Sequence, residues 1–199
     1  MADRADHTPT SPLITPEPPP GPPEPGASTR PRPLFVYGAL CAPALLAWAL
    51  TGRAGPLCAL ARTRARAHGL ARFSLRGRDY PAAVRREGEA GGEKPWVDGY
   101  LVAAATAGQR RILDAFEGAV GGRPSRVAVT LLEGGGSGAV VDADAHLWEG
   151  DDAALTGEPW DPEVFVRERV GVWLCAIRAL GLMEEEEAAE AESEERTGV

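Results

Sequence analysis

Short apolar runs and alternating segments along the chain predict several β-strands. A strand shows either period-2 alternation or a brief continuous apolar stretch. Five segments fit this description: 34–37 (LFVY), 62–84 (RTRARAHGLARFSLRGRDYPAAV), 96–104 (WVDGYLVAA), 125–133 (SRVAVTLLE) and 139–150 (AVVDADAHLWEG). In 62–84 arginine alternates with apolar or small residues, which indicates edge strands with one solvated face.

Three other segments follow the helical period instead. Pro43 is placed to open a helix that continues through 44–52, because proline suits the first helical position. The second helix, 106–118, gathers its apolar side chains on one face and ends on a glycine. The third helix, 161–181, begins with Asp161 as its N-cap.

Both ends of the chain differ in composition from its middle. Residues 9–33 hold 11 of the 18 prolines and few apolar residues, which is too little apolar surface to offset the entropy of ordering. We therefore expect a disordered leader over 1–33, one folded domain over 34–182, and an acidic tail over 183–199 that is a helical extension or disordered. A length of 199 residues suits one such domain.

The formal charge of the chain is concentrated in this tail. Residues 184–196 contain eight glutamates and one arginine, and so carry −7 of the net charge of −8. The domain before the tail is neutral, which predicts neither a nucleic-acid nor a membrane partner. We expect a soluble, cytoplasmic protein, because the leader lacks the apolar region of a secretory signal and no apolar run approaches the roughly 20 residues of a membrane span.

Cysteine and histidine are too few and too scattered for most familiar site chemistry. Cys41, Cys58 and Cys175 are odd in number and far apart, which excludes a disulfide framework and a CxxC pair, and we expect all three in the core. His68 and His146 have no partners at ligand spacing, so neither a metal site nor a Ser-His-Asp triad is predicted. His146 is interpreted as a strand residue rather than as a base.

Glu117 is the carboxylate whose surroundings are most informative. It lies at the C-terminal end of the helix 106–118, directly after the apolar Phe116. The negative end of the helix dipole and partial burial both disfavour its ionised form, and so raise its pKa toward the range in which a general acid or base works best. A hydrated glutamate beside the C-capping Gly118 is the alternative that this local pattern leaves open.

Seven short motifs then follow one another over roughly 34–180: FVYGAL, DYPAAV, VDGYLV, LDAFEG, RVAV, AHLW and WDPEVFVRERVGVWL. Their order and spacing resemble the gamma-glutamylcyclotransferase-like family, and its avirulence-induced-gene-like branch is the nearest match. The resemblance implies a single α+β domain with a small mixed β-barrel, helices packed outside it, and a cavity at its open end.

The resemblance also implies an activity and a site. Glu117 would take a proton from the α-amino group of a γ-glutamyl substrate, whose nitrogen then attacks its own γ-carbonyl and releases 5-oxoproline and an amine or amino acid. Tyr37, Gly38, Ala39 and Leu40 would form the YGxL loop, which binds the substrate through backbone amides. No metal and no cofactor are needed, because the nucleophile is part of the substrate and effective molarity supplies much of the rate.

The chain departs from the family pattern in two places. Ala39 stands where relatives often carry serine or threonine, and no tyrosine follows Glu117 in EGAVGGRPSRVAV, although Arg126 can take the place of the family arginine. The glycines in this stretch indicate an altered, looser lid. Two functions therefore stay open: a γ-glutamyl cyclotransferase, and a catalytically silent member of the same fold that binds a small metabolite or a protein.

Five further residues near the motifs are weaker candidates. Tyr80 either faces the cavity, as a substrate-binding residue, or packs at a strand edge. Trp148 and Trp173 are expected to pack in the core, and Asp98 and Asp114 are expected to be solvated. The sequence does not choose among γ-glutamyl substrates and does not fix the oligomeric state.

Overall fold

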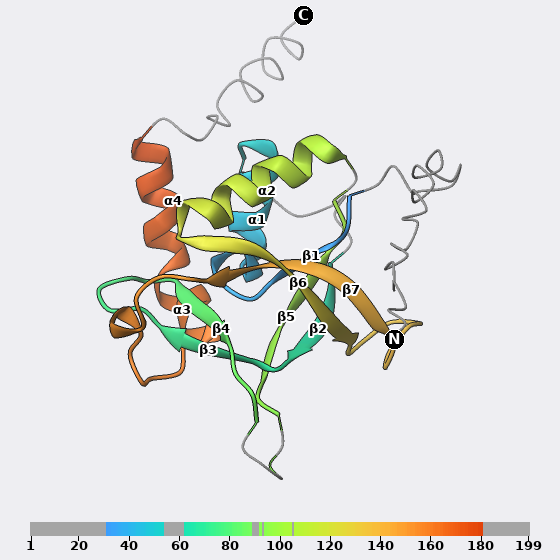
Figure 1. Ribbon diagram of the computed structural model, residues 1–199. Helices are drawn as coiled ribbons and strands as arrows, with labels where there is room; N and C mark the ends of the chain where they lie inside the picture. The colour runs from blue at the N-terminus through green and yellow to red at the C-terminus, as the bar shows by residue number, and fades with distance from the viewer. Residues whose placement is uncertain (1–30, 54–61, 89–91, 93, 105, 181–199) are drawn as a thin grey trace, which may run out of the picture.

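A closed five-stranded barrel forms the centre of the computed structural model, which describes residues 31–53, 62–88, 92, 94–104 and 106–180 (Figure 1). Around the barrel the strands follow the order β1 (Leu34–Val36), β5 (Trp96–Val102), β2 (Arg62–His68), β6 (Gly122–Leu131) and β7 (Val140–Trp148). Neighbouring strands pair antiparallel, except that β1 and β7 pair in parallel and close the barrel. With the helices outside it, this is the α+β barrel that the motif order implied.

A second, two-stranded sheet lies against the barrel. β3 (Leu70–Ser74) and β4 (Pro81–Arg85) pair antiparallel, and β4 packs against β7 while β3 packs against β5. An isolated bridge joins Leu75 to Leu155, just after the short 3-10 helix η2 (Asp152–Ala154). The hairpin is therefore fastened both to the barrel and to the segment that leads into the C-terminal helices.

The α-helices of the described residues cover one side of the barrel. They are α1 (Pro43–Thr51), α2 (Ala107–Ala119), α3 (Pro162–Glu168) and α4 (Val170–Ala179). α2 lies across β6 and β7 and packs on α1, and α1 in turn packs on α4 (Figure 1). The position of α2 matters most for the site, because its inner face meets the outer face of β7.

Two helix ends match the residues that the sequence predicted, whereas α2 continues past the predicted Gly118 and ends at Ala119. Gly52 ends α1 with φ of 76°, a left-handed conformation that glycine adopts without strain. Asp161 caps α3, since its side chain accepts a hydrogen bond from the Glu163 amide. The single helix predicted over 161–181 was wrong in one respect, because Arg169 separates α3 from α4.

Small side chains fill the barrel interior. Ala65, Ala67, Ala143 and Ala145 are fully buried there beside Phe35. A second buried cluster joins α1 to α3 and α4, and a third packs β1 against α1 and α2. The barrel is thus a packed core, as small barrels generally are, and the helices build a separate core outside it.

Strand β2 is not the edge strand that its sequence predicted. It lies between β5 and β6, and its alternate residues Arg62, Arg64 and Arg66 stand on the outer face of the barrel. Asp98, expected to be solvated, lies in β5 and accepts two hydrogen bonds from Arg66, at 2.6 and 2.9 Å. The guanidinium of Arg62 stacks over the ring of Tyr100 at 4.4 Å. Two of the three arginines of β2, Arg62 and Arg66, are therefore held by partners on β5.

Several expectations concern the cysteines and the chain ends. Cys41 is buried as expected, but Cys175 is exposed on α4, and Cys58 lies outside the described residues. The predicted leader and tail lie outside them as well, except for the last three residues of the leader, where Arg32 forms an ion pair of 2.6 Å with Asp144. No described helix is both long and apolar enough to cross a bilayer.

Candidate active site

Strand β7 divides its side chains between the barrel interior and α2. Ala143 and Ala145 fill the barrel core, and so the alternate residues Asp144, His146 and Trp148 lie on the opposite face of the strand. This outer face is the one that α2 covers. Asp144 and His146 are therefore placed under a helix rather than in solvent.

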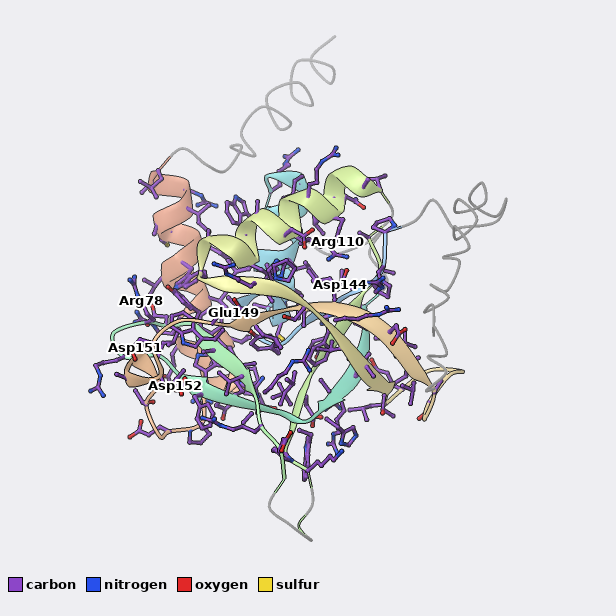
Figure 2. The ribbon with its side chains drawn as sticks, in the orientation of Figure 1. Arg78, Arg110, Asp144, Glu149, Asp151 and Asp152 are labelled. Atoms are coloured by element: carbon purple, nitrogen blue, oxygen red, sulfur yellow. The ribbon has the colours of Figure 1, made fainter. Side chains whose placement is uncertain are left out.

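Helix α2 presents its own polar residues to this face, at i, i+4 and i+7: Arg110, Asp114 and Glu117. Arg110 contacts Asp144 through Nη2 at 2.8 Å and Asp114 through Nε at 2.9 Å. Figure 2 shows Arg110 on α2 close to Asp144 on β7. Oδ1 of Asp114 lies 3.7 Å from Nε2 of His146. A line of polar groups therefore runs between α2 and β7 and leads toward Glu117.

A small cavity lies at the end of this line. Its wall combines the end of β1, the start of β4, the last turn of α2 and the paired ends of β6 and β7. The predicted site residues Tyr37, Gly38, Ala39, Tyr80 and Glu117 all line it. Its volume is about 20 Å³, close to the space that one water molecule requires. The fold thus brings together residues from four separate parts of the sequence.

Leu40 is the predicted site residue whose side chain lies elsewhere. It does not line the cavity and is fully buried beside Leu34 and Leu46. Three residues of the YGxL loop therefore line the cavity, while the side chain of the fourth residue, Leu40, anchors the loop in the core between β1 and α1.

Gly38 serves close approach rather than an unusual backbone conformation. Its φ is −115°, so no positive φ demands a glycine here. A Cβ atom built on Gly38 would lie 3.3 Å from Cδ of Pro81, which is tighter than ordinary contact. The missing side chain therefore lets the start of β4 pack directly against the loop.

Glu117 lies in the last turn of α2, which ends at Ala119. Burial raises the pKa of its carboxyl group from 4.5 to about 7, and the negative charge of Asp114 adds to the effect. A carboxyl group with this pKa can both accept and release a proton at neutral pH, as a general acid/base must. The sequence predicted the direction of this shift from burial and the helix dipole, but not the contribution of Asp114.

Three neighbouring titratable side chains are held in their neutral forms. Burial, and then the charge of Glu117, raises the pKa of Tyr37 far above its usual value, and the phenol donates a hydrogen bond to the carbonyl oxygen of His146. Burial raises the pKa of Cys41 to about 12, so this thiol is no nucleophile. Burial also lowers the pKa of His146. Among these four side chains, Glu117 is the one poised to exchange a proton at neutral pH.

Tyr80 is held at the cavity by contacts with the C-terminal helices. Its ring meets that of Trp173 edge-on, with 6.4 Å between the centroids. The side chain of Asp79 accepts hydrogen bonds from Arg169 at 2.6 Å and from Trp173 at 3.2 Å, and its carbonyl oxygen accepts one from Trp160 at 2.8 Å. Trp173 therefore packs between elements, as expected, and ties α4 to the start of β4.

Asp114, His146 and Trp148 are the residues of this region that the sequence reasoning missed. Asp114, predicted to be solvated, is 35% exposed, but it also lies between Arg110 and His146. His146 is a strand residue, as interpreted, yet His146 and Trp148 both line the cavity. Two signals in the sequence could have found them: the polar residues at i, i+4 and i+7 on α2, and the alternate polar residues that begin at Asp144 on β7. The fold places these two series opposite each other.

The residues after α2 form an ordered strand rather than a looser lid. Gly121 makes the turn with φ of 89°, and from Gly122 the chain runs in β6, paired with β7. Arg126 does not line the cavity, and it pairs on the surface with Asp142 at 2.9 Å. The stretch that departs from the family pattern thus builds the wall on which His146 and Trp148 are aligned.

Comparison with known proteins identifies a family whose sequence pattern this chain matches. The chain matches the family model described as "Gamma-glutamyl cyclotransferase, AIG2-like" over residues 34–162. Two solution structures of Arabidopsis thaliana proteins are similar to it. At3g28950.1 has 21% identity and a TM-score of 0.51, with 77% of this chain and 84% of that chain covered. At5g39720.1 has 24% identity and a TM-score of 0.49, with 75% and 89% covered. No curated protein matches the chain.

The family match covers the parts of the structure that build the cavity. It runs from the first residue of β1 to the first residue of α3, and so includes the barrel, the β3 and β4 hairpin, and α2. The likeness to At3g28950.1 supports the fold alone, because the identity is low. Since the match to the family model spans more than half of the sequence, the chain belongs to the AIG2-like gamma-glutamyl cyclotransferase family.

Proposed function

We propose that this protein is a γ-glutamyl cyclotransferase, which releases 5-oxoproline and an amine or amino acid from a γ-glutamyl substrate. One observation carries the proposal: Glu117 has a pKa raised to about 7 by burial, in the wall of a cavity that Tyr37, Gly38 and Ala39 also line. Family membership supports the same class of reaction. A cytoplasmic location is part of the proposal.

Glu117 acts first as a base and then as an acid. Its carboxylate takes a proton from the α-amino nitrogen of the substrate, and the freed electron pair attacks the γ-carbonyl carbon. The five-membered ring closes and the carbonyl oxygen becomes an oxyanion. Glu117 then returns its proton to the leaving nitrogen and takes the second proton from the ring nitrogen. As the intermediate collapses, the bond from carbon to the leaving nitrogen breaks, and Glu117 passes the second proton to the released amine. One carboxyl group suffices, because each proton it takes is given back within the same turnover.

The loop after β1 is suited to bind the oxyanion. It continues into the short 3-10 helix η1 (Ala39–Cys41), and the first amide groups of a helix have no partners within that helix. We assign stabilisation of the oxyanion to the backbone amide of Ala39, which lines the cavity and is fixed before the reaction starts. Leu40 does not line the cavity, and its buried side chain holds the loop still.

The cavity must enlarge before such a substrate can bind, since about 20 Å³ accommodates only a water molecule. We assign this opening to Tyr80, which lines the cavity at the start of β4 and meets Trp173 through a ring contact. Rotation of this side chain widens the cavity without disturbing the barrel.

The proposal is tested by replacing Glu117→Gln, which keeps the shape of the side chain and removes its ability to exchange a proton. We expect release of 5-oxoproline from a panel of γ-glutamyl amino acids and γ-glutamylamines to fall by about 10²- to 10⁴-fold. Glu149→Gln is the matched control, because Glu149 is exposed and pairs only with Arg123 among the described residues. No product from the folded parent on any substrate would overturn the proposal, and so would full activity of Glu117→Gln.

A second function is favoured by the small volume of the cavity and by Ala39, which offers no hydroxyl group to a ligand. In this alternative the protein is a catalytically silent member of the family that binds a small metabolite or a protein partner. Saturable binding of 5-oxoproline by a protein that turns over no γ-glutamyl substrate would favour it.

A further inference from the structure

Two buried ring nitrogens in the described part of the chain have no hydrogen-bond partner, and they lie two residues apart on β7. They are Nδ1 of His146 and Nε1 of Trp148. Each residue also lines the cavity that contains Glu117. An unpaired buried polar group is costly and therefore uncommon in folded proteins. Two of them in the wall of one cavity point to a ligand that supplies the missing partners.

The indole ring of Trp148 is held in place by two glycines. A Cβ atom built on Gly121 would lie 2.9 Å from Cζ3 of this ring, and one built on Gly150 would lie 2.3 Å from Cζ2. Either distance is shorter than real Cβ contacts, so the ring occupies space that only glycine leaves free. Trp148 is thus seated between two turns of backbone, which fixes where its N–H group lies.

The imidazole of His146 is fixed as well, and its surroundings select a tautomer. The residue is 3% exposed. Its carbonyl oxygen accepts a hydrogen bond from the Tyr37 hydroxyl, and its Nε2 faces Oδ1 of Asp114 at 3.7 Å. A neighbouring carboxylate favours a proton on the nitrogen that faces it, which leaves Nδ1 as a hydrogen-bond acceptor. An indole Nε1 can only donate. The wall of β7 therefore offers one acceptor and one donor.

We propose that His146 and Trp148 form a polar subsite that binds the γ-glutamyl group, with Nε1 of Trp148 donating to a substrate oxygen and Nδ1 of His146 accepting from a substrate N–H. This inference rests on the proposed function and names residues that hold its substrate. A γ-glutamyl group offers both partners, through its α-amino nitrogen and its γ-carbonyl. In the product 5-oxoproline the N–H and C=O groups lie on the same edge of the lactam ring, so one ligand can satisfy both nitrogens.

The direct test is nuclear magnetic resonance of the ¹⁵N-labelled protein, titrated with 5-oxoproline. The chain has five tryptophans, and Trp148→Phe identifies the indole signal of Trp148 by its loss. We expect that signal to shift saturably as 5-oxoproline is added. The signal of Trp96 should not shift, because Trp96 is 41% exposed on β5 and does not line the cavity. An indole signal of Trp148 that stays unchanged at saturating 5-oxoproline would overturn the inference.

Binding by variants provides the second test. We expect Trp148→Phe and His146→Leu each to weaken 5-oxoproline binding about tenfold, as loss of one hydrogen bond predicts, whereas Trp96→Phe should bind as the parent does. His146→Asn should bind more tightly than His146→Leu, because its side chain can again present an acceptor near the position of Nδ1. Gly150→Ala should weaken binding as well, since its Cβ displaces the indole ring while leaving the N–H group intact. Dissociation constants within twofold of the parent in both Trp148→Phe and His146→Leu would overturn the inference.

Turnover measurements separate this inference from the proposed function. Glutamyl cyclisation that is lost in Glu117→Gln, together with an unmoved Trp148 signal, would overturn the subsite alone. A saturable Trp148 signal in a protein without turnover would support the subsite and overturn the reaction. Turnover whose KM rises in Trp148→Phe and His146→Leu, with a smaller change in kcat, would support both.

Discussion

Glu117 has to give up most of its contact with water in order to lie in the cavity wall. Burial is the main reason that its pKa rises to about 7, and Asp114, one helical turn earlier, is the second. Asp114 is itself held between α2 and β7, because it pairs with Arg110 and faces His146. The proton affinity of one side chain is therefore set by the packing of α2 on β7, not by Glu117 alone.

The pH dependence of the proposed turnover follows from this pKa. The base form of Glu117 is the carboxylate, so kcat/KM should rise about tenfold per pH unit below pH 7 and level off above it. Asp114→Asn removes a negative charge that raises the pKa of Glu117, and should move this rise to lower pH. Steady-state rates between pH 5 and pH 9 check both statements. A rise that moves to higher pH in Asp114→Asn would contradict them.

The same pKa makes Glu117 a source of instability at neutral pH. Its folded pKa of about 7 exceeds the ordinary value of 4.5, so the folded state binds the proton more tightly than the unfolded state does. The free energy of unfolding therefore falls as pH rises between these two values, by at most about 3 kcal/mol at 1.4 kcal/mol per pKa unit. We expect Glu117→Gln to be more stable than the parent at pH 8 and close to it at pH 4.5. Urea unfolding at both pH values measures the difference, and equal stability at pH 8 would contradict it.

At the scale of elements, the ion pairs that join α2 to β7 are much more buried than an ion pair on the open surface of the barrel. The side chain of Arg110 is 11% exposed and contacts both Asp144 and Asp114. Arg126 and Asp142, on the neighbouring strands β6 and β7, form a pair of similar length with 64% and 61% exposure. The two pairs offer a comparison within one protein of a covered and an open ion pair.

We expect Arg110→Gln to lower the free energy of unfolding by about 2–3 kcal/mol, because it leaves Asp114 without its cation and leaves Asp144 with Arg32 alone. Arg126→Gln is the matched control and should cost less than about 1 kcal/mol, since an exposed ion pair contributes little. Chemical denaturation of the two variants at pH 7 gives both values. Equal losses in the two variants would show that burial under α2 has no energetic role.

Local signals predicted the elements well, and non-local ones were needed for the rest. Gly52 and Asp161 fixed helix ends because capping depends on a few neighbouring residues. β2 was misplaced at an edge because its arginines look solvated, whereas Arg62 and Arg66 in fact stack on aromatic rings of β5. No pattern within β2 contains its partner strand. The sequence thus predicted which segments are strands, but not how the barrel orders them.

The candidate site divides in the same way. Glu117 and Tyr37 belong to recognisable motifs and could be predicted as site residues. His146 and Asp114 could not, because their proximity exists only once α2 lies over β7. Their side chains are ordinary in sequence and become informative through burial, which no single segment determines.

At the scale of the whole molecule, the cavity lies where the barrel, the hairpin of β3 and β4, and α2 meet, and the C-terminal helices join the hairpin beside it. Asp79 holds this junction together, since it binds Arg169 and Trp173 by its side chain and Trp160 by its carbonyl oxygen. The hydrogen bond from Arg169 lowers the pKa of Asp79, so its contribution is present above the ordinary carboxyl pKa and is lost as pH falls below it. Access to the cavity is thereby linked to contacts made outside it.

Asp79→Ala should loosen the hairpin without unfolding the barrel. We expect amide hydrogen exchange in 80–85 to accelerate by an amount that corresponds to about 1–2 kcal/mol, as loss of charge-assisted hydrogen bonds predicts. Exchange in β2 and β5 should stay unchanged. Asp142→Ala serves as control, because its ion pair lies on the surface. Uniform acceleration across the barrel would instead mean that the hairpin and barrel open as one unit.

The alanines inside the barrel have a consequence for how this family can diversify. Because Ala65, Ala67, Ala143 and Ala145 are fully buried in the packed core of the barrel, a larger residue at any of them would collide with its neighbours. The seam between the barrel, α2 and the hairpin carries no such restriction, since its residues reach a cavity rather than a packed centre. Residues of this seam can therefore be exchanged during evolution, which changes the shape of the cavity, while the barrel core stays the same.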